Sequence, residues 1–224
     1  EGRYYSDAVA WAAENGIVTG ITDTLFAPNQ PVTREQLVTM IGRYAEKKGI
    51  EIVAKGDLNA YPDASNVSNY AKAYMIWAVE NGITLGVDAT HFKPNDSCTR
   101  GQVVTFLWRA AGCPAPAGTE CPFGDVVPDQ YCYQAVLWAY ENEIALGVSG
   151  NLFNPEGTVT RGQVVTFLWR AMGQPPAETE NPFQDISEDR FYYSAVLWAV
   201  QSGIPTAWRP GNLSRRTTAP GARW

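Results

Sequence analysis

A tryptophan that recurs at nearly constant intervals constrains the fold of this chain more than any other feature of the sequence. Its copies are separated by 66, 61 and 60 residues, and each lies in a segment rich in Ala, Val and Tyr: Trp11, Trp77, Trp138 and Trp198. A Gly-Ile or Glu-Ile pair follows each segment within a few residues. Because self-similarity at a fixed period indicates repeated structural units, we expect a repeat protein here.

The spacing continues beyond the tryptophan in the first three units. Nine residues after it comes a glycine, six further a phenylalanine, and two further a proline; five residues after the proline stands a Thr-Arg pair. The glycines are Gly20, Gly86 and Gly147, and the pairs are Thr33-Arg34, Thr99-Arg100 and Thr160-Arg161. Differences in length between units are confined to the linkers, so the units share one local structure.

Each unit is predicted to be a helix, a loop and a second helix. In the first unit Tyr4, Ala8 and Trp11 fall on one helical face, and Gly16 ends that helix. The Thr-Arg pair opens the second helix, because Thr-x-x-Gln is a capping box worth about 1 kcal/mol. The intervening Gly-x5-Phe-x-Pro stretch is short and regular, which favours a packed turn.

The repeats divide the chain into five segments. Unit 1 covers residues 1–49, unit 2 residues 61–113 and unit 3 residues 122–173, while residues 182–204 start a fourth unit. Unit 1 is truncated at its start, and the chain begins at a glutamate, so we expect a piece of a longer precursor. Residues 205–224 carry four arginines and no acid, and we expect a disordered basic tail. A shifted reading frame and a basic wall-binding tail are the two explanations considered for it.

The overall charge and hydropathy exclude several classes of partner. A formal net charge of −6 and a sequence pI near 4.9 argue against nucleic acid, which requires a basic stripe. No apolar run approaches the roughly 20 residues that span a bilayer, so membrane insertion is not expected. The 45 percent of hydrophobic residues is ample for a buried core.

The inventory of reactive side chains argues against an enzyme. His91 is the only histidine, which excludes Ser-His-Asp and Cys-His sites, and its place in the repeat predicts a packing position. No Cys-x-x-Cys pair is present, so neither a metal nor another cofactor is expected. Cys113 and Cys121 could close a small loop as a disulfide, or all four cysteines could be free thiols. A carboxylate pair is not excluded by inventory, but no such pair stands out.

Together these elements resemble the S-layer homology repeat. The resemblance rests on the acidic turns Tyr61-Pro62-Asp63, Phe123-Gly124-Asp125 and Phe183-Gln184-Asp185, the tryptophan-bearing helix, Gly-x5-Phe-x-Pro and Thr-Arg-x-Gln, over roughly residues 1–204. The Thr-Arg element of the family usually continues Ala-Glu, whereas here it continues Glu-Gln once and Gly-Gln twice. The resemblance implies an all-α fold in which tandem helix-loop-helix repeats form a pseudo-threefold arrangement around a central helical bundle.

The resemblance also implies a function and a set of site residues. Such domains hold extracellular proteins on the bacterial cell wall or S-layer by binding secondary cell-wall polysaccharide, often pyruvylated, in grooves between repeats. The family is often fused to a cargo domain. Carried over by position, the polysaccharide-binding candidates are Arg34, Arg100, Arg161, Asp63, Asp125, Asp185, Trp77, Trp138, Gly86 and Gly147.

Each candidate also has a structural interpretation. The arginines offer forked donors to an anion at a helix start, or they brace the repeat through ion pairs with the acidic turns. The tryptophans stack on sugars or, as their helical spacing favours, are buried. The aspartates contact sugar hydroxyls or cap the following helix, and the glycines supply a positive φ or let a ligand approach. A helical-repeat spacer or protein-interaction module is therefore the alternative to a glycan anchor.

Overall fold

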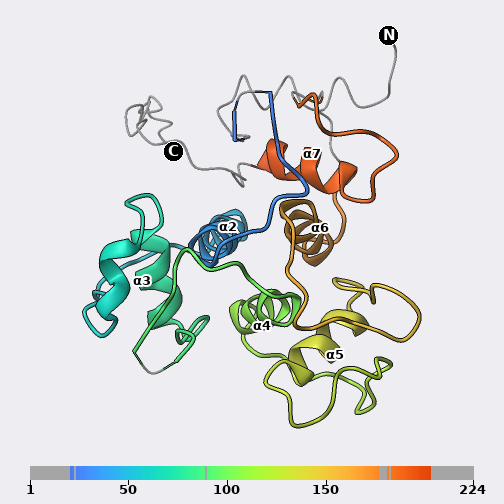
Figure 1. Cartoon of the computed structure of the whole chain (residues 1–224), viewed down its shortest axis with the longest axis horizontal. Helices are drawn as coiled ribbons and strands as arrows, with labels where there is room; N and C mark the ends of the chain where they lie inside the picture. The colour runs from blue at the N-terminus through green and yellow to red at the C-terminus, as the bar shows by residue number, and fades with distance from the viewer. Residues whose placement is uncertain (1–20, 23, 89, 177–180, 182, 203–224) are drawn as a thin grey trace, which may run out of the picture.

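The computed structural model describes residues 21–22, 24–88, 90–176, 181 and 183–202, and its regular structure in this part of the chain is helical (Figure 1). The α-helices are α2 (Arg34–Lys47), α3 (Lys72–Glu80), α4 (Arg100–Ala110), α5 (Tyr133–Glu141), α6 (Arg161–Ala171) and α7 (Tyr193–Ser202), with a 3-10 helix η1 (Pro62–Asn66). Only isolated β-bridges occur among these residues. The predicted all-α class is confirmed. The predicted helix around Trp11 and the basic tail lie outside the described residues.

In the part of the chain that the structure describes, three helices lie at the centre and three lie around them. In Figure 1, α2, α4 and α6 lie side by side at the centre, and α3, α5 and α7 lie outside them. Helix α2 contacts both α4 and α6. The central helices are those that begin at Thr-Arg, and the predicted capping boxes are present at all three starts. Those caps fix where each central helix begins.

The segments that lead into the central helices are joined by a closed cycle of hydrogen bonds. The amide of Val32 donates to the carbonyl of Val159 (3.2 Å), Val159 to Cys98 (3.1 Å) and Cys98 back to Val32 (2.9 Å). These three residues occupy the same position in their units, and all are buried. The cycle supports the pseudo-threefold arrangement, which remains a prediction for the units as wholes.

Each central helix packs against the outer helix of the following unit. The pairs are α2 with α3, α4 with α5 and α6 with α7. The predicted unit boundaries remain a prediction, and the packing pairs cross them. A unit therefore shares its core with its neighbour, as expected for a repeat that cannot bury its apolar face alone.

The size of the residue after each Thr-Arg pair fits the space that the next outer helix leaves for it. A Cβ at Gly101 would lie 2.8 Å from the Tyr131 hydroxyl and 3.2 Å from the Cys132 sulfur, and a Cβ at Gly162 would lie 2.7 Å from the Tyr192 ring. Unit 1 has Glu35 at this position, and the small Ala71 stands where Cys132 and Tyr192 stand in their units. The glycines therefore admit the next outer helix, and Glu35 is accommodated because its neighbour is small.

The cysteines and His91 do not form a reactive centre. All four cysteines are free, with Cys98 and Cys132 buried, Cys121 half-buried and Cys113 exposed. His91 is exposed and hydrogen-bonds Asp88 through Nδ1 (3.2 Å), so the predicted packing position is wrong. Within the described ranges, no cluster of three or more His, Cys, Asp or Glu side chains is placed to hold a metal. Nor does any described helix have the length and apolar character needed to cross a membrane.

Candidate ligand-binding groove

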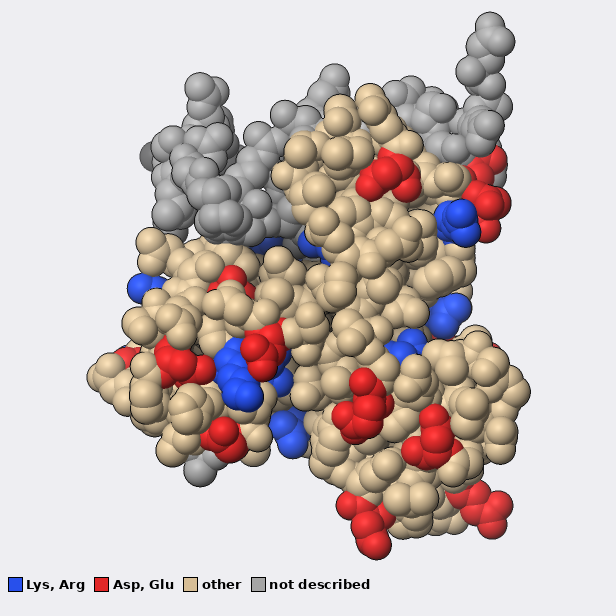
Figure 2. Space-filling model, in the orientation of Figure 1, with Lys and Arg blue, Asp and Glu red and all other residues tan. Residues whose placement is uncertain are grey.

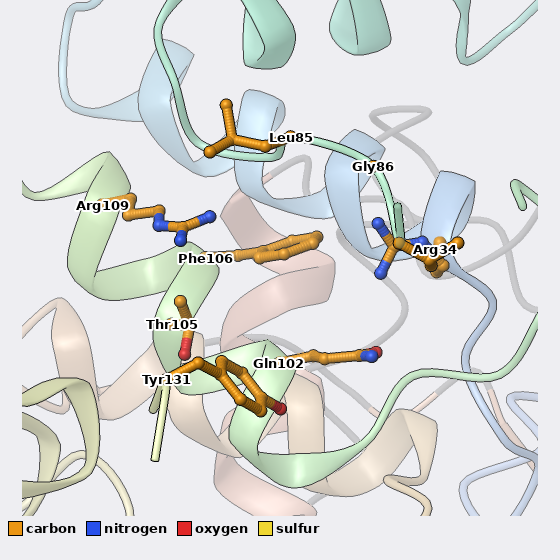
Figure 3. A pocket seen from close by; sticks show the side chains of 9 residues that line it. Arg34, Leu85, Gly86, Gln102, Thr105, Phe106, Arg109 and Tyr131 are labelled. Carbon is orange, nitrogen blue, oxygen red and sulfur yellow. The ribbon is translucent and has the colours of Figure 1, made fainter. Parts of the chain in front are cut away.

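A cavity of about 270 Å³ lies between α2, α4 and the loop of unit 2, residues 84–94, which connects α3 to α4 (Figure 3). We call it the α2–α4 groove. Its lining residues are Arg34, Leu85, Gly86, Val87, Gln102, Thr105, Phe106, Arg109 and Tyr131. Two arginines and no carboxylate line it. In Figure 3 the guanidinium groups of Arg34 and Arg109 lie on either side of the Phe106 ring. Two guanidinium groups that line one cavity can hold a carboxylate through charge-assisted hydrogen bonds.

Arg34 forms one wall of the groove and also fastens the loop of unit 2. It is buried, and its Nε donates to the Phe92 carbonyl (2.8 Å) while Nη2 donates to the Thr84 hydroxyl (3.3 Å). The guanidinium lies 4.9 Å from the Phe92 ring centroid and 5.3 Å from that of Phe106. Burial lowers the pKa of Arg34 from its ordinary value. The arginine is thus a structural clamp that also faces the groove.

The other two arginines make the same clamp in their units. Arg100 Nε donates to the Phe153 carbonyl (2.9 Å) and Nη2 to the Leu146 carbonyl (2.9 Å), and Arg161 Nε donates to the Phe26 carbonyl (2.9 Å). Burial lowers the pKa of Arg100 and of Arg161 to about 10. Both arginines hold loop carbonyls, and within the described residues no ion pair joins either of them to an acidic turn. Among the described residues, the buried Nη2 of Arg161 has no hydrogen-bond partner.

The aspartates of the acidic turns hold the same loops from the other side. Asp63 accepts from the amides of Phe92 (3.0 Å) and Lys93 (2.7 Å), and Asp125 accepts from those of Phe153 (2.8 Å) and Asn154 (2.7 Å). Lys93 and Asn154 have φ of 53° and 59°, a left-handed conformation that is unfavourable for most side chains. The carboxylates therefore fix a strained turn, and neither α3 nor α5 has a side-chain cap.

Hydrogen bonding also sets the charge state of one of these carboxylates. Burial alone would raise the pKa of Asp63, but the backbone amides of Phe92 and Lys93 outweigh it. The net result is a pKa below the ordinary value, because amide donors stabilise the ionised form. Asp63 therefore stays charged and keeps the loop in place at neutral pH.

The predicted tryptophans and glycines lie at different depths. Trp77 is buried and Trp138 half-buried, and neither lines the α2–α4 groove. Gly86 lines it with φ of 84°, as predicted, and a Cβ there would lie 2.7 Å from the His91 carbonyl oxygen. Gly147 does not have a positive φ, so that expectation is wrong; a Cβ there would lie 2.7 Å from the Leu152 carbonyl oxygen. Close packing explains this glycine.

Most of the residues that line the groove were not predicted from the sequence. The unpredicted lining residues on α4 are Gln102, Thr105, Phe106 and Arg109. They occur at intervals of three, one and three residues, which is one helical face, and Val103, Val104 and Leu107 occupy the other face. Thr105 and Phe106 are buried at the base of the groove. The identical stretch in unit 3 repeats this face on α6. Helical periodicity could have identified this face. Leu85 and Tyr131 come from other segments of the chain, and only the folded structure shows that they line the groove.

The surface charges are distributed unevenly around this site. On the face in Figure 2, the lobe around α5 has several acidic side chains on its outer surface, while basic side chains are spread over the rest of the molecule, several of them between the lobes. The chain as a whole has a net charge of −6. A cationic groove in an acidic protein attracts anions locally, because near charges dominate when salt screens distant ones.

Comparison with known proteins gives a consistent family signal. The sequence model of the S-layer homology domain matches residues 2–38, 60–104 and 122–165, more than half of the chain. The chain is similar to a surface-layer 125 kDa protein of Lysinibacillus sphaericus, with 38% identity over 100 residues that make up 43% of this chain and 8% of that protein. A cell surface protein of Thermoanaerobacter kivui is 27% identical over 171 residues, 76% of this chain and 20% of that protein.

An enzyme is also among the similar proteins. An endoglucanase of Bacillus sp. (strain KSM-635) is 38% identical over 109 residues, which cover 45% of this chain and 11% of that enzyme. The matched part of each of these three relatives is therefore at most a fifth of its length. The likeness concerns a shared module and not the whole of any relative.

Proposed function

Because the chain belongs to the S-layer homology domain family, we propose that it anchors a larger protein by binding an anionic secondary cell-wall polysaccharide in its inter-repeat grooves. Domains of this family attach extracellular proteins to the bacterial cell wall, so the coarse role and the location follow from membership. The glycan and the groove residues are the proposal. A pyruvylated sugar fits the chemistry, since its carboxylate is a compact anion.

The α2–α4 groove is the single observation that carries this proposal. A carboxylate placed beside Phe106 would meet the guanidinium groups of Arg34 and Arg109, and each charge-assisted hydrogen bond would contribute about 1.5–3 kcal/mol. The exposed Tyr131 and the half-buried Gln102 offer further polar atoms at the rim. One such groove gives modest affinity, and several grooves on one polymer would add avidity.

We infer that the module itself is not catalytic. The endoglucanase resembles this chain over 11% of its own length, and the family model that matches here is the anchoring domain. The recurrent aspartates Asp63, Asp125 and Asp185 hold loop amides, which is a structural task. A cargo domain elsewhere in the protein would supply any activity.

Arg109 is the residue on which to test the groove. The clamp arginines are unsuitable, because removing them would disturb the loops as well as the site. Arg109 is half-buried and donates one long hydrogen bond of 3.5 Å to the Ile83 carbonyl, so loss of its side chain should leave the fold intact. The full chain would be co-sedimented with bacterial sacculi before and after acid removal of secondary polysaccharide.

We expect the native chain to bind intact sacculi, to lose binding after acid treatment, and to bind about tenfold more weakly as Arg109→Ala. Lys47→Ala, at the exposed end of α2, is the matched control for loss of one positive charge. Binding that survives acid treatment, or that falls equally in both variants, would refute the groove. No binding to any sacculus tested would favour the helical-repeat spacer.

A further inference from the structure

Gly42 on the central helix α2 is packed directly against the ring of Tyr74 on the outer helix α3. A Cβ added at Gly42 would overlap Cδ1 of the Tyr74 ring and would lie 2.9 Å from Cε1 and 3.1 Å from Cγ. Tyr74 is half-buried, and its hydroxyl donates to the carboxylate of Glu46 on α2 (3.1 Å), so the ring is fastened to the helix on which it packs. The central helix therefore has the small residue at this contact, and the outer helix has the large one.

The sizes are reversed at the equivalent positions of the other two helix pairs. The central helices α4 and α6 have a tryptophan where α2 has glycine, and the outer helices α5 and α7 have an alanine where α3 has tyrosine: Trp108, Trp169, Ala135 and Ala195. Both alanines are fully buried. Each indole nitrogen donates to the carbonyl of a proline in the linker that follows, at 2.8 Å. In these two pairs the large residue therefore belongs to the central helix.

A second position on the same helical faces shows the opposite reversal. Glu35 and Gly42 are seven residues apart on α2, and Ala71 and Tyr74 are three apart at the start of α3, so each pair lies on one face. Here α2 has the large residue, whose carboxylate accepts from the amide (2.9 Å) and the hydroxyl (2.8 Å) of Ser68. The other central helices have a glycine there, packed against an outer residue larger than alanine.

We propose that these two contacts specify α3 as the partner of α2 among the outer helices α3, α5 and α7. If α3 were placed on α4 or α6, the Tyr74 ring would meet an indole. If α5 or α7 were placed on α2, the residue that replaces Ala71 would meet the side chain of Glu35. Both mismatches overfill the interface, which is destabilising. Size alone therefore separates the α2–α3 pair from the other two.

This pairing also determines how the α2–α4 groove is assembled. Residues 85–87 line the groove and belong to the loop that follows α3, while Arg34 lines it from α2. The two sets of residues meet only when α3 packs on α2. Gly42 and Tyr74 are therefore positioning residues for the groove although they do not line it. The inference concerns the assembly of the fold and holds whether or not the groove binds a glycan.

A double-mutant cycle in the full chain, read by thermal unfolding, tests the contact between Gly42 and Tyr74. Replacing glycine by alanine inside a helix ordinarily increases stability, because alanine has the higher helix propensity. Gly42→Ala should instead lower the melting temperature by about 2–4 °C, since its methyl group overlaps the Tyr74 ring. In the Tyr74→Ala background the same change should raise the melting temperature by about 2–4 °C.

The matched control is Tyr140→Ala, which removes an exposed tyrosine from α5. Gly42→Ala should remain unfavourable in that background, because the Tyr74 ring is still present. The proposal is wrong if Gly42→Ala changes the melting temperature in the same direction in the native chain and in Tyr74→Ala. It is equally wrong if removal of Tyr140 reverses the effect as well as removal of Tyr74 does.

The reciprocal change on α4 and α5 tests whether the large outer residue is rejected elsewhere. Ala135→Tyr should lower the melting temperature by about 10 °C, because Trp108 occupies the corresponding space, and Trp108→Gly should recover part of that loss. If Ala135→Tyr does not fold alone, recovery of a folded chain in the double variant supports the proposal. If Ala135→Tyr melts like the native chain, or if Trp108→Gly only adds to its loss, α4 does not discriminate by size and the proposal fails.

Discussion

The α2–α4 groove and the equivalent position one unit later are built on identical central helices but differ in their chemistry. The groove uses the helix Arg100–Ala110, and the equivalent position, which we call the α4–α6 position, uses Arg161–Ala171, which has the same sequence. Arg100 lies 5.3 Å from the Phe167 ring centroid there, as Arg34 lies 5.3 Å from that of Phe106. The surrounding residues differ, since Tyr131 corresponds to Phe191 and the loops belong to different units. A repeated helix therefore does not produce a repeated site.

The difference extends to charge and to the clamp arginines. Gly82 in unit 2 corresponds to Glu143 in unit 3, whose carboxylate partly opposes the lowering of the Arg170 pKa by burial. Arg34 donates to one carbonyl and to the Thr84 hydroxyl, whereas Arg100 donates to two carbonyls. The α2–α4 groove is therefore the more cationic, and the loop at the α4–α6 position is held by one more hydrogen bond to a carbonyl.

The largest expected effect concerns the clamps. Arg34→Ala and Arg100→Ala should each lower the free energy of unfolding by about 2–5 kcal/mol, since buried carbonyls lose their donors. Arg100→Ala should be the more costly by about 1 kcal/mol, because two carbonyls are left unpaired whereas the Thr84 hydroxyl can rotate to another partner. Urea unfolding with matched m-values would measure both, and equal losses would contradict the proposed difference.

The next largest effect concerns Asp63 and Asp125, which hold the loops of units 2 and 3. Asp63→Asn and Asp125→Asn should each destabilise the chain by about 1–2 kcal/mol, since one amide loses its charged acceptor. Asp63→Asn should be the worse variant, because the turn it holds puts Lys93 at positive φ, while Asn154 tolerates that conformation. Thermal unfolding at pH 7 would rank them, and the reverse order would refute the argument from φ.

The lowered pKa of Asp63 gives this comparison a pH signature. A carboxyl with a folded pKa below its unfolded value adds stability that is complete above the unfolded value, about 3.9, and is lost as pH falls through the folded value. The stability gap between the native chain and Asp63→Asn should therefore be constant near neutral pH and shrink below about pH 4. A gap that stays constant down to pH 2 would show that the charge of Asp63 is not what holds the turn.

A smaller effect is expected for Arg109 on α4 and for its equivalent on α6, Arg170. Arg109→Ala should weaken binding to sacculi about tenfold, and Arg170→Ala should weaken it less, because Glu143 already offsets part of the Arg170 charge. Both variants should keep the native melting temperature within a few degrees. Titration of sacculi at low salt would separate them, and a stronger effect of Arg170→Ala would place the main site at the α4–α6 position.

The smallest expected effect comes from introducing a glutamate into unit 2 at the position that Glu143 occupies in unit 3. Gly82→Glu should weaken binding by about two- to fivefold, since it places a carboxylate near Arg109, as Glu143 is near Arg170. Gly82 has φ of 64° and Glu143 has 55°, so the position accepts a glutamate. Gly82→Gln controls for the backbone, and the difference between the two variants should vanish in high salt.

Local features of the molecule were predicted from the sequence better than contacts between distant residues. The capping boxes at Thr33, Thr99 and Thr160 were predicted because a cap depends on residues three positions apart. The tasks of Asp63 and Arg34 were not, because both hold a loop about 30 or more residues away. Arg109 was not predicted, although the helical face on which it lies recurs in the sequence. That face can be recognised as part of a cavity only when the residues that lie opposite it in the folded chain are known.

The sequence by itself determined the repeats, the all-α class, the helix starts and the resemblance to the family, because each rests on local spacing and local hydrogen bonding. Only the tertiary structure decided which unit supports which neighbour. Asp185 is 159 residues from Phe26 in the chain, yet the two are hydrogen-bonded. Equivalent half-repeats have similar sequences, so local patterns do not distinguish their positions. Packing against α6 and the hydrogen bonds of Asp185 to Phe26 and Ala27 place residues 183–202 beside unit 1.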